Sequence, residues 1–145
     1  MLEIPLVRLD ADLPLPSYAR TGDAGCDLVA RSDAVLAAGG GRAIVATGVA
    51  LEIPVGYAGL VLSRSGLASK HGVACLNAPG LIDPGYRGEI AVILVNTDPA
   101  TAYEVHRGDR IAQLVICGVE EAHFLAVGHL ETSERGDGGF GHSGR

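Results

Sequence analysis

Gly80-Leu81-Ile82-Asp83-Pro84-Gly85-Tyr86-Arg87-Gly88-Glu89-Ile90 is a polar stretch set between two apolar segments. Its Pro-Gly pair is typical of a tight turn, because proline presets φ and glycine can supply a positive φ. Strand-like runs lie on either side, at 74–76 and 90–95. The pattern therefore predicts a β-hairpin with Asp83 at its tip.

The acid of this turn is the first candidate for chemistry. A carboxylate at Asp83, with the flat ring of Tyr86 three residues later, can hold a water and a sugar in a fixed relation. The alternative interpretation is structural, since an aspartate before proline commonly forms an Asx-turn. This stretch alone leaves both interpretations open.

In the rest of the chain, too, glycine and proline separate short apolar segments. Short apolar runs rich in β-branched residues, each bounded by Gly or Pro, predict an all-β sandwich or barrel. The run 91–95 is continuously apolar, which predicts a strand covered on both faces. One short helix is expected at 67–71. The expected strands are 4–9, 28–30, 43–47, 49–53, 59–62, 90–96, 103–105 and 111–119.

Length and composition favour one domain with a modest aliphatic core. The chain has 145 residues, of which 48% are hydrophobic, but it has no Trp and only two Phe. We expect a β domain at 1–132 and a mobile, Gly-rich C-terminal arm at 133–145. The net charge of −6 disfavours nonspecific binding to nucleic acid or to an acidic membrane. A polyanionic ligand would therefore need a local cluster of arginines.

The cysteines and the chain ends indicate a cellular compartment. Cys26, Cys75 and Cys117 are odd in number and far apart, which disfavours a disulfide framework or a zinc site and favours a reducing environment. The first residues show no signal-peptide pattern, and no apolar run has the ~18 residues of a membrane span. We expect a cytoplasmic protein without a membrane partner.

Asp27 is a candidate for contact with a metal ion. It opens the expected strand at 28–30, directly after a turn that contains glycine. A hydrated Mg²⁺ keeps several of its waters and needs few protein ligands, so one carboxylate at such a position can hold it. The alternative is an acid that only serves the turn and faces solvent.

Ser63-Arg64-Ser65-Gly66-Leu67 leads from an expected strand into the expected helix. A helix start offers unpaired N–H groups that suit a phosphate. Arg64 adds a forked cation, Ser65 a hydroxyl, and Gly66 permits close approach of the backbone. The alternative is a serine N-cap with a surface arginine.

Two amide side chains are further candidates for ligand contacts. Asn77 precedes the acidic turn and can offer a donor and an acceptor to the edge of a base. Gln113 lies among apolar neighbours at the start of a strand, where it can donate to a phosphate. The structural alternatives are a turn-forming Asn77 and a satisfied core amide at Gln113.

The C-terminal stretch 135–144 contains the spacing G-x-G-x-x-G, which is also found in dinucleotide-binding folds. The context excludes that interpretation, because no strand leads into it and four residues are too few for the helix that must follow. What remains is a polar strip with one arginine, Arg135, and one aromatic ring, Phe140. Such a strip can fold over a ligand, or it can be an inert tail.

Taken together and in this order, five segments resemble the motifs of the homotrimeric dUTPases (deoxyuridine triphosphate nucleotidohydrolases). A single glycine-rich motif would be weak support, but five in order across nearly the whole chain are specific. The segments are Ala24-Gly25-Cys26-Asp27-Leu28, Arg64-Ser65-Gly66-Leu67-Ala68, Asn77 through Ile90, Arg107-Gly108-Asp109-Arg110-Ile111-Ala112-Gln113, and Arg135-Gly136-Asp137-Gly138-Gly139-Phe140-Gly141.

The resemblance implies a jelly-roll homotrimer that hydrolyses dUTP to dUMP and pyrophosphate with Mg²⁺. It implies that Asp83 is the base for a water that attacks the α-phosphorus, and that Asp27 lies near the waters of the metal. It also implies that each active site is shared among subunits. Arg135 and Phe140, in the arm of a neighbour, would close over the γ-phosphate and the base.

The resemblance also assigns the contacts of the substrate. Tyr86 would lie under the deoxyribose and leave no room for a ribose 2′-hydroxyl. Asn77, with the main chain near Leu81 and Ile82, would bind uracil. The residues expected to bind the phosphates are Arg64, Ser65, Gly66 and Gln113.

Two other functions compete with this hypothesis. A dCTP deaminase has the same fold, but its members resemble this chain less around the segment 82–89. A trimeric nucleotide-binding regulator without turnover is the second alternative. Retention of both Asp83 and the complete C-terminal motif argues against it.

Overall fold

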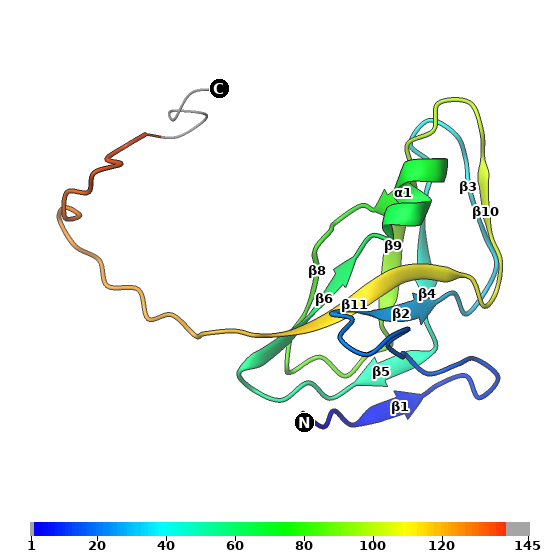
Figure 1. Cartoon of the computed structure of the whole chain (residues 1–145), viewed down its shortest axis with the longest axis horizontal. Coiled ribbons are helices and arrows are strands. Elements are labelled where there is room, and N and C mark those ends of the chain that lie inside the picture. Colours follow the sequence, from blue (N-terminus) through cyan, green and yellow to red (C-terminus); the bar gives the residue numbers. More distant parts are fainter. Residues whose placement is uncertain (1, 139–145) are drawn as a thin grey trace.

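The structure, a computed structural model, describes residues 2–138 as a β body with one short helix and an extended C-terminal arm (Figure 1). The predicted all-β class is confirmed. The elements are β1 (Leu6–Arg8), β2 (Cys26–Val29), β3 (Ala34–Leu36), β4 (Arg42–Ala46), β5 (Val49–Leu51), β6 (Tyr57–Leu62), α1 (Ser65–His71), β7 (Val73–Cys75), β8 (Gly80–Ile82), β9 (Ala91–Asn96), β10 (Tyr103–Val105) and β11 (Arg110–Gly118).

Two sheets make up most of the body. One has the strand order β2-β11-β6-β8 and the other β4-β9-β7, while β1 pairs with β5 and β3 with β10. These pairings are antiparallel, and most join strands that are far apart in the sequence. Within residues 2–138 the sheets do not close into a barrel.

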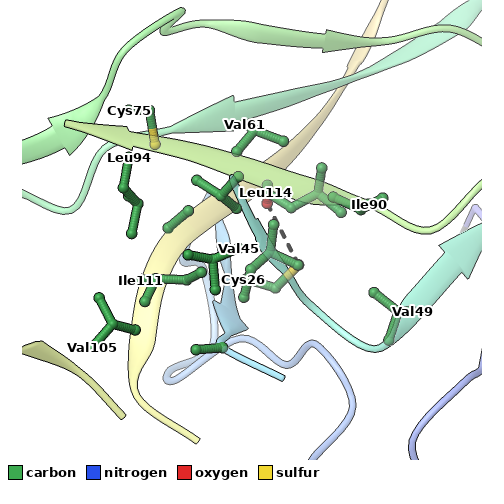
Figure 2. Close-up of a cluster of buried hydrophobic side chains, with 14 of the residues drawn as sticks. Cys26, Val45, Val49, Val61, Cys75, Ile90, Leu94, Val105, Ile111 and Leu114 are labelled. Carbon is green, nitrogen blue, oxygen red and sulfur yellow. Dashed lines mark hydrogen bonds between the residues drawn. The ribbon is translucent and has the colours of Figure 1, made fainter. Parts of the chain in front are cut away.

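Aliphatic side chains from both sheets meet in a single core (Figure 2). Val45 and Leu94 come from the three-stranded sheet, and Val61 and Leu114 from the four-stranded one. All four are at most 4% exposed. The core is built from Val, Leu, Ile and Ala, as expected for a chain without Trp.

The cysteines are free thiols, as the sequence predicts. Cys26 and Cys75 are buried in the core, and the Cys26 thiol lies 3.5 Å from the carbonyl oxygen of Leu114, to which it donates (Figure 2). Burial raises the pKa of both thiols. Both therefore pack as small apolar side chains and not as reactive thiolates.

The expectation that both faces of β9 are covered is only partly met. Its residues alternate: Val92 and Leu94 are buried, while Ile93 and Val95 on the other face are half-buried. Ile93 lies opposite Ile44 of β4, which is 73% exposed. The outer face of this sheet is thus apolar but incompletely covered in the single chain.

The predicted hairpin is correct in its outer strands and wrong at its tip. Strands β7 and β9 do pair, with Cys75 opposite Leu94. Between them, however, the chain forms β8, which pairs with β6 of the other sheet. Asp83 therefore lies in a loop that crosses from one sheet to the other. The sequence pattern does not predict strands β8 and β3, and it places Gly80-Leu81-Ile82 in the turn segment, because the pairing of β8 with β6 is long-range.

Helix α1 is longer than predicted and begins at Ser65. Its N-cap residue is Arg64, whose backbone is extended, so neither neighbouring serine caps it. It ends at Gly72, whose φ of 64° is left-handed and whose N–H donates to the carbonyl of Ala68. No helix among residues 2–138 has the length and hydropathy that a membrane span requires.

After β11 the chain leaves the body as an arm (Figure 1). The β domain was expected to continue to residue 132, but the last strand ends at Gly118, and 119–132 form neither strand nor helix. Several apolar side chains of this arm are exposed in the single chain. They are Val119, Phe124, Leu125, Val127 and Leu130.

Candidate active site

The acidic turn is closed by its main chain. The N–H of Tyr86 donates to the carbonyl oxygen of Asp83 at 3.1 Å, so the turn does not depend on the aspartate side chain. Asp83 itself is exposed. The predicted positive φ at Gly85 is wrong, because this glycine is not among those with a left-handed backbone. Proline at the second position suits a type I turn, which needs no positive φ.

Both ends of the loop 83–89 are fixed to the body. Its start continues from β8, where Ile82 lies opposite Gly59 of β6. At its end the Glu89 carboxylate accepts hydrogen bonds from Arg31 at 3.0 and 3.2 Å and from the N–H of Gly48 at 2.8 Å. Ile90, the next residue, is fully buried. The carboxylate of Asp83 is therefore exposed on a loop with little freedom to move.

The salt bridges around Arg31 extend this anchor to the N-terminal segment. Arg31 lies 3.6 Å from Asp10, which also accepts hydrogen bonds from the guanidinium of Arg107. The Arg107 hydrogen bond lowers the pKa of Asp10 from its usual 3.8 to about 2, and Arg31 contributes more weakly. The loop 83–89 is thereby linked to residues far away in the sequence.

The residues predicted to bind uracil lie beside this loop. Leu81 and Ile82 belong to β8, which is an edge strand of its sheet, with no strand beyond it among residues 2–138. Asn77 is exposed, and its amide lies against Gly80, where an added Cβ would be 3.3 Å from Nδ2. Tyr86 is 44% exposed. The structure therefore places Asn77, Leu81, Ile82, Asp83 and Tyr86 in one region.

A second region, called here the arginine corner, contains Asp27, Arg64, Arg110 and Gln113. Asp27 lies opposite Gln113 in the register of β2 and β11. Its Oδ1 is 3.2 Å from Nε of Arg64, and its Oδ2 is 3.3 Å from Nη1 of Arg110. The side chains of Asp27 and Arg64 are only 18% and 23% exposed, so this pair is partly desolvated. Asp27 therefore orients two cations.

The other two phosphate candidates adjoin the arginine corner. Ser65 and Gly66 form the first turn of α1, directly after Arg64, and both are exposed. A Cβ added at Gly66 would meet nothing within 4 Å, so the space above this glycine is open. Gln113 is half-buried and not buried, which does not agree with the alternative interpretation of a core amide.

Arg110 is a residue of this region that sequence reasoning did not single out. A register shift between Arg110 and Ala112 interrupts the pairing of β11 with β2 and brings Arg110 to Asp27. Its carbonyl also accepts a hydrogen bond from Arg64 at 3.1 Å. The register shift depends on pairing across more than 80 residues, so the local sequence carried no signal for it.

The two regions do not meet within one chain. Ile82 lies opposite Gly59, near the start of β6, whereas Arg64 follows its end. Gly59 and Arg64 are five residues apart, of which 59–62 belong to β6, so a fully extended chain would separate their backbones by roughly 17 Å at about 3.3 Å per residue. A cavity of about 370 Å³ is lined by Asp27 and Arg110 of the arginine corner and by no residue of the loop 83–89.

The C-terminal motif is described only in part. Arg135 is exposed, and its Nε donates to the carbonyl of Gly138 at 2.8 Å. It belongs to the segment after β11, which extends away from the β body (Figure 1). Phe140 lies outside the described residues. The predicted closure of Arg135 and Phe140 over a ligand therefore stays a prediction.

The chain is similar to known proteins over nearly its whole length. The dUTPase family model matches residues 11–144. Deoxyuridine 5′-triphosphate nucleotidohydrolases of Thermobifida fusca and Mycobacterium tuberculosis are 57% and 53% identical to the chain. The alignments cover 99% and 97% of this chain and 79% and 94% of those proteins.

Solved structures are similar over the same length. The dUTPase of Staphylococcus bacteriophage 80alpha, solved with dUPNHPP, has a TM-score of 0.91 and 30% identity, with all of both chains covered. A mutant dUTPase of the S. aureus phage phi11, described with a structural Mg(II) ion, has a TM-score of 0.81 and 26% identity over 90% of this chain and all of that one. The agreement of family model, relatives and fold over nearly the whole chain shows that this protein belongs to the dUTPase family.

Proposed function

We propose that this protein hydrolyses dUTP to dUMP and pyrophosphate, with Asp83 as the general base. Membership of the dUTPase family supports the reaction. The observation that carries the role of Asp83 is an exposed carboxylate on a loop fixed at both ends. A base held in one place can orient a water and need not be reorganised during the reaction.

In this mechanism the carboxylate of Asp83 accepts a proton from a water as the water oxygen bonds to the α-phosphorus. The bond between the α-phosphorus and the bridging oxygen breaks, and its electron pair leaves with pyrophosphate. The proton on Asp83 then passes to solvent. Such a base typically contributes ~10²–10⁴-fold, and the rest of the acceleration comes from positioning and charge neutralisation.

The region around β8 would select the nucleoside. Asn77 and the free edge of β8 at Leu81 and Ile82 would form hydrogen bonds to uracil. These reject cytosine strongly, because a wrong base leaves polar groups unpaired. The 5-methyl group of thymine would be excluded by steric fit, which discriminates less. Tyr86 would lie under the deoxyribose.

The arginine corner would bind the triphosphate, with Arg64, Ser65, Gly66 and Gln113 as its contacts. Asp27 also fits an indirect role with Mg²⁺. A carboxylate has about four acceptor sites, and the two arginines use one each, so two remain for metal-bound waters. Mg²⁺, held mainly by the substrate phosphates, would neutralise their charge. Asp27 would keep Arg64 pointed at the same phosphates.

We further propose a homotrimer with shared active sites. The separation of the two regions along β6, roughly 17 Å of extended chain, supports a site in which the Asp83 loop of one copy meets the arginine corner of another. Apolar surface supports assembly, since Ile44 is 73% exposed and Phe124 of the arm 90%. The arm of one copy would carry Arg135 and Phe140 to the site of a neighbour. In the cytoplasm such an enzyme would limit uracil incorporation into DNA and supply dUMP for thymidylate synthesis.

A substrate panel tests the proposal. With Mg²⁺ present, pyrophosphate release is expected from dUTP and only weakly from UTP, dTTP and dCTP, and chelation of the metal should stop it. Ammonia release from dCTP would instead support a deaminase. Tight dUTP binding without any pyrophosphate would support a regulator. Either of these two outcomes contradicts the proposed hydrolase.

A further inference from the structure

The ring of Tyr86 is folded back onto its own loop. Its hydroxyl donates to the carbonyl oxygen of Glu89 at 2.9 Å. A Cβ added at Gly88 would clash with the Tyr86 hydroxyl oxygen and would lie 2.6 Å from Cζ and 3.1 Å from Cε2. The ring therefore lies directly against Gly88, in a space that any side chain would fill.

Both polar ends of Tyr86 are tied to the main chain. Its N–H closes the turn to Asp83, and its hydroxyl is bound to Glu89. Glu89 is itself fixed by Arg31 and Gly48. Tyr86 thus connects the two ends of the loop. Its ring is held by the hydrogen bond to the carbonyl of Glu89 and by contact with Gly88, which has no side chain.

The two glycines of the loop differ in what surrounds them. Neither Gly85 nor Gly88 has a left-handed φ, so neither is required by its backbone conformation. A Cβ at Gly85 would meet nothing within 4 Å. At Gly88 the same methyl would meet three atoms of the Tyr86 side chain. The requirement for glycine at 88 is therefore steric and is set by the aromatic ring.

We propose that Gly88 is a positioning residue for sugar specificity: it sets the height of the Tyr86 ring and thereby the preference for deoxyribose over ribose. This inference rests on the proposed function, in which the ring lies under the sugar. A methyl group at residue 88 would overlap the Tyr86 side chain. The ring would have to move away by about 1 Å to restore an ordinary contact of 3.4 Å. The exposed ring can move by that amount, but its fit to the deoxyribose is then lost.

The test compares kcat/KM for dUTP and for UTP in matched variants. Gly88→Ala should lower the ratio of the two values about tenfold or more, mainly by slowing dUTP, since a steric fit of this kind discriminates by ~10–200-fold. Gly85→Ala adds the same methyl to the same loop and should keep the ratio within about twofold of the wild type. Tyr86→Phe keeps the aromatic ring against Gly88 and removes only the hydroxyl that donates to Glu89. Its effect on the ratio should therefore be smaller than that of Gly88→Ala.

A double-mutant cycle separates positioning from general damage. In a Tyr86→Ala background no ring remains to be displaced, so adding Gly88→Ala should change the ratio by less than about twofold. An undiminished effect of Gly88→Ala in that background would overturn the inference. So would a wild-type ratio in the single variant.

NMR of the free protein provides a readout that does not depend on turnover. Ring protons of Tyr86 should show nuclear Overhauser effects to the Hα protons of Gly88, because the ring lies directly against this glycine. The absence of these effects would overturn the inference in a protein that still hydrolyses dUTP. A wild-type protein that releases no pyrophosphate from dUTP would instead overturn the proposed function, and the sugar role of Gly88 with it.

Discussion

Mixing two inactive variants should restore activity if the active site is shared between chains. Asp83→Asn removes the proposed base, and Arg64→Gln removes a proposed phosphate contact at the opposite end of β6. Because these ends are separated by roughly 17 Å of extended chain, we expect each working site to take the two residues from different copies. Asp83→Asn alone should retain no more than ~1% activity, given the ~10²–10⁴-fold contribution of a general base. Arg64→Gln alone should also be much less active than the wild type, because it loses a charged phosphate contact.

The size of the recovery follows from the symmetry. In a cyclic trimer each site is a junction between one subunit and the next. A trimer with two copies of one variant and one of the other has a single junction at which Arg64 and Asp83 are both intact. Purified mixed trimers should therefore show about one third of the wild-type activity, in whichever order the subunits are arranged.

The assay requires subunits with two different affinity tags. The variants are denatured and refolded together, mixed trimers are purified by both tags in sequence, and pyrophosphate release is measured per trimer. As a control, Asp83→Asn is mixed with the double variant Arg64→Gln/Asp83→Asn, because no subunit then supplies the carboxylate. Mixed trimers no more active than this control would refute the shared site and the register argument behind it.

Two further predictions concern stability. Leu94→Ala, at a fully buried position, should lower the free energy of unfolding by ~2–5 kcal/mol, measured by urea denaturation at fixed protein concentration. Leu15→Ala, at a position 46% exposed, should lower it by less than ~1 kcal/mol. Equal losses in the two variants would contradict the assigned core. Asp10 has a folded pKa of about 2, below its usual 3.8, so its stabilising contribution is complete above about pH 5 and is lost progressively as the pH falls toward 2. Asp10→Asn should flatten this part of the stability curve, and a curve that matches the wild type would disprove the link to Arg107.

Much of the fold could be predicted because the apolar runs are short and clearly bounded. Glycine and proline mark the ends of most strands, so the run at 103–105 was located without error and those at 43–47 and 111–119 within one residue. The aliphatic core follows from composition, since few large aromatic residues are present. The grouping of Asn77 with Asp83 could also be predicted, because the two residues are close in the sequence.

The parts that could not be predicted depend on long-range pairing. Nothing in Gly80-Leu81-Ile82 shows that it joins β6, and this pairing turns the expected hairpin tip into a loop between sheets. The contact of Arg110 with Asp27 requires a register shift between strands more than 80 residues apart. Gly85 had been expected to supply a positive φ, but Pro84 suffices for the turn, and it is Gly88 that has a steric reason to be glycine.

The net charge of −6 explains why the cations are arranged as they are. A chain with this charge would not attract the proposed triphosphate through its overall field, so binding would depend on arginines that are held close together. The guanidinium groups of Arg64 and Arg110 repel each other, because both lie beside Asp27. The carboxylate of Asp27 offsets this repulsion by pairing with both. The same carboxylate that makes the cluster stable also reduces its net charge. A bound metal, or the arm of a neighbour that brings Arg135, would then supply the remaining positive charge only when substrate is present.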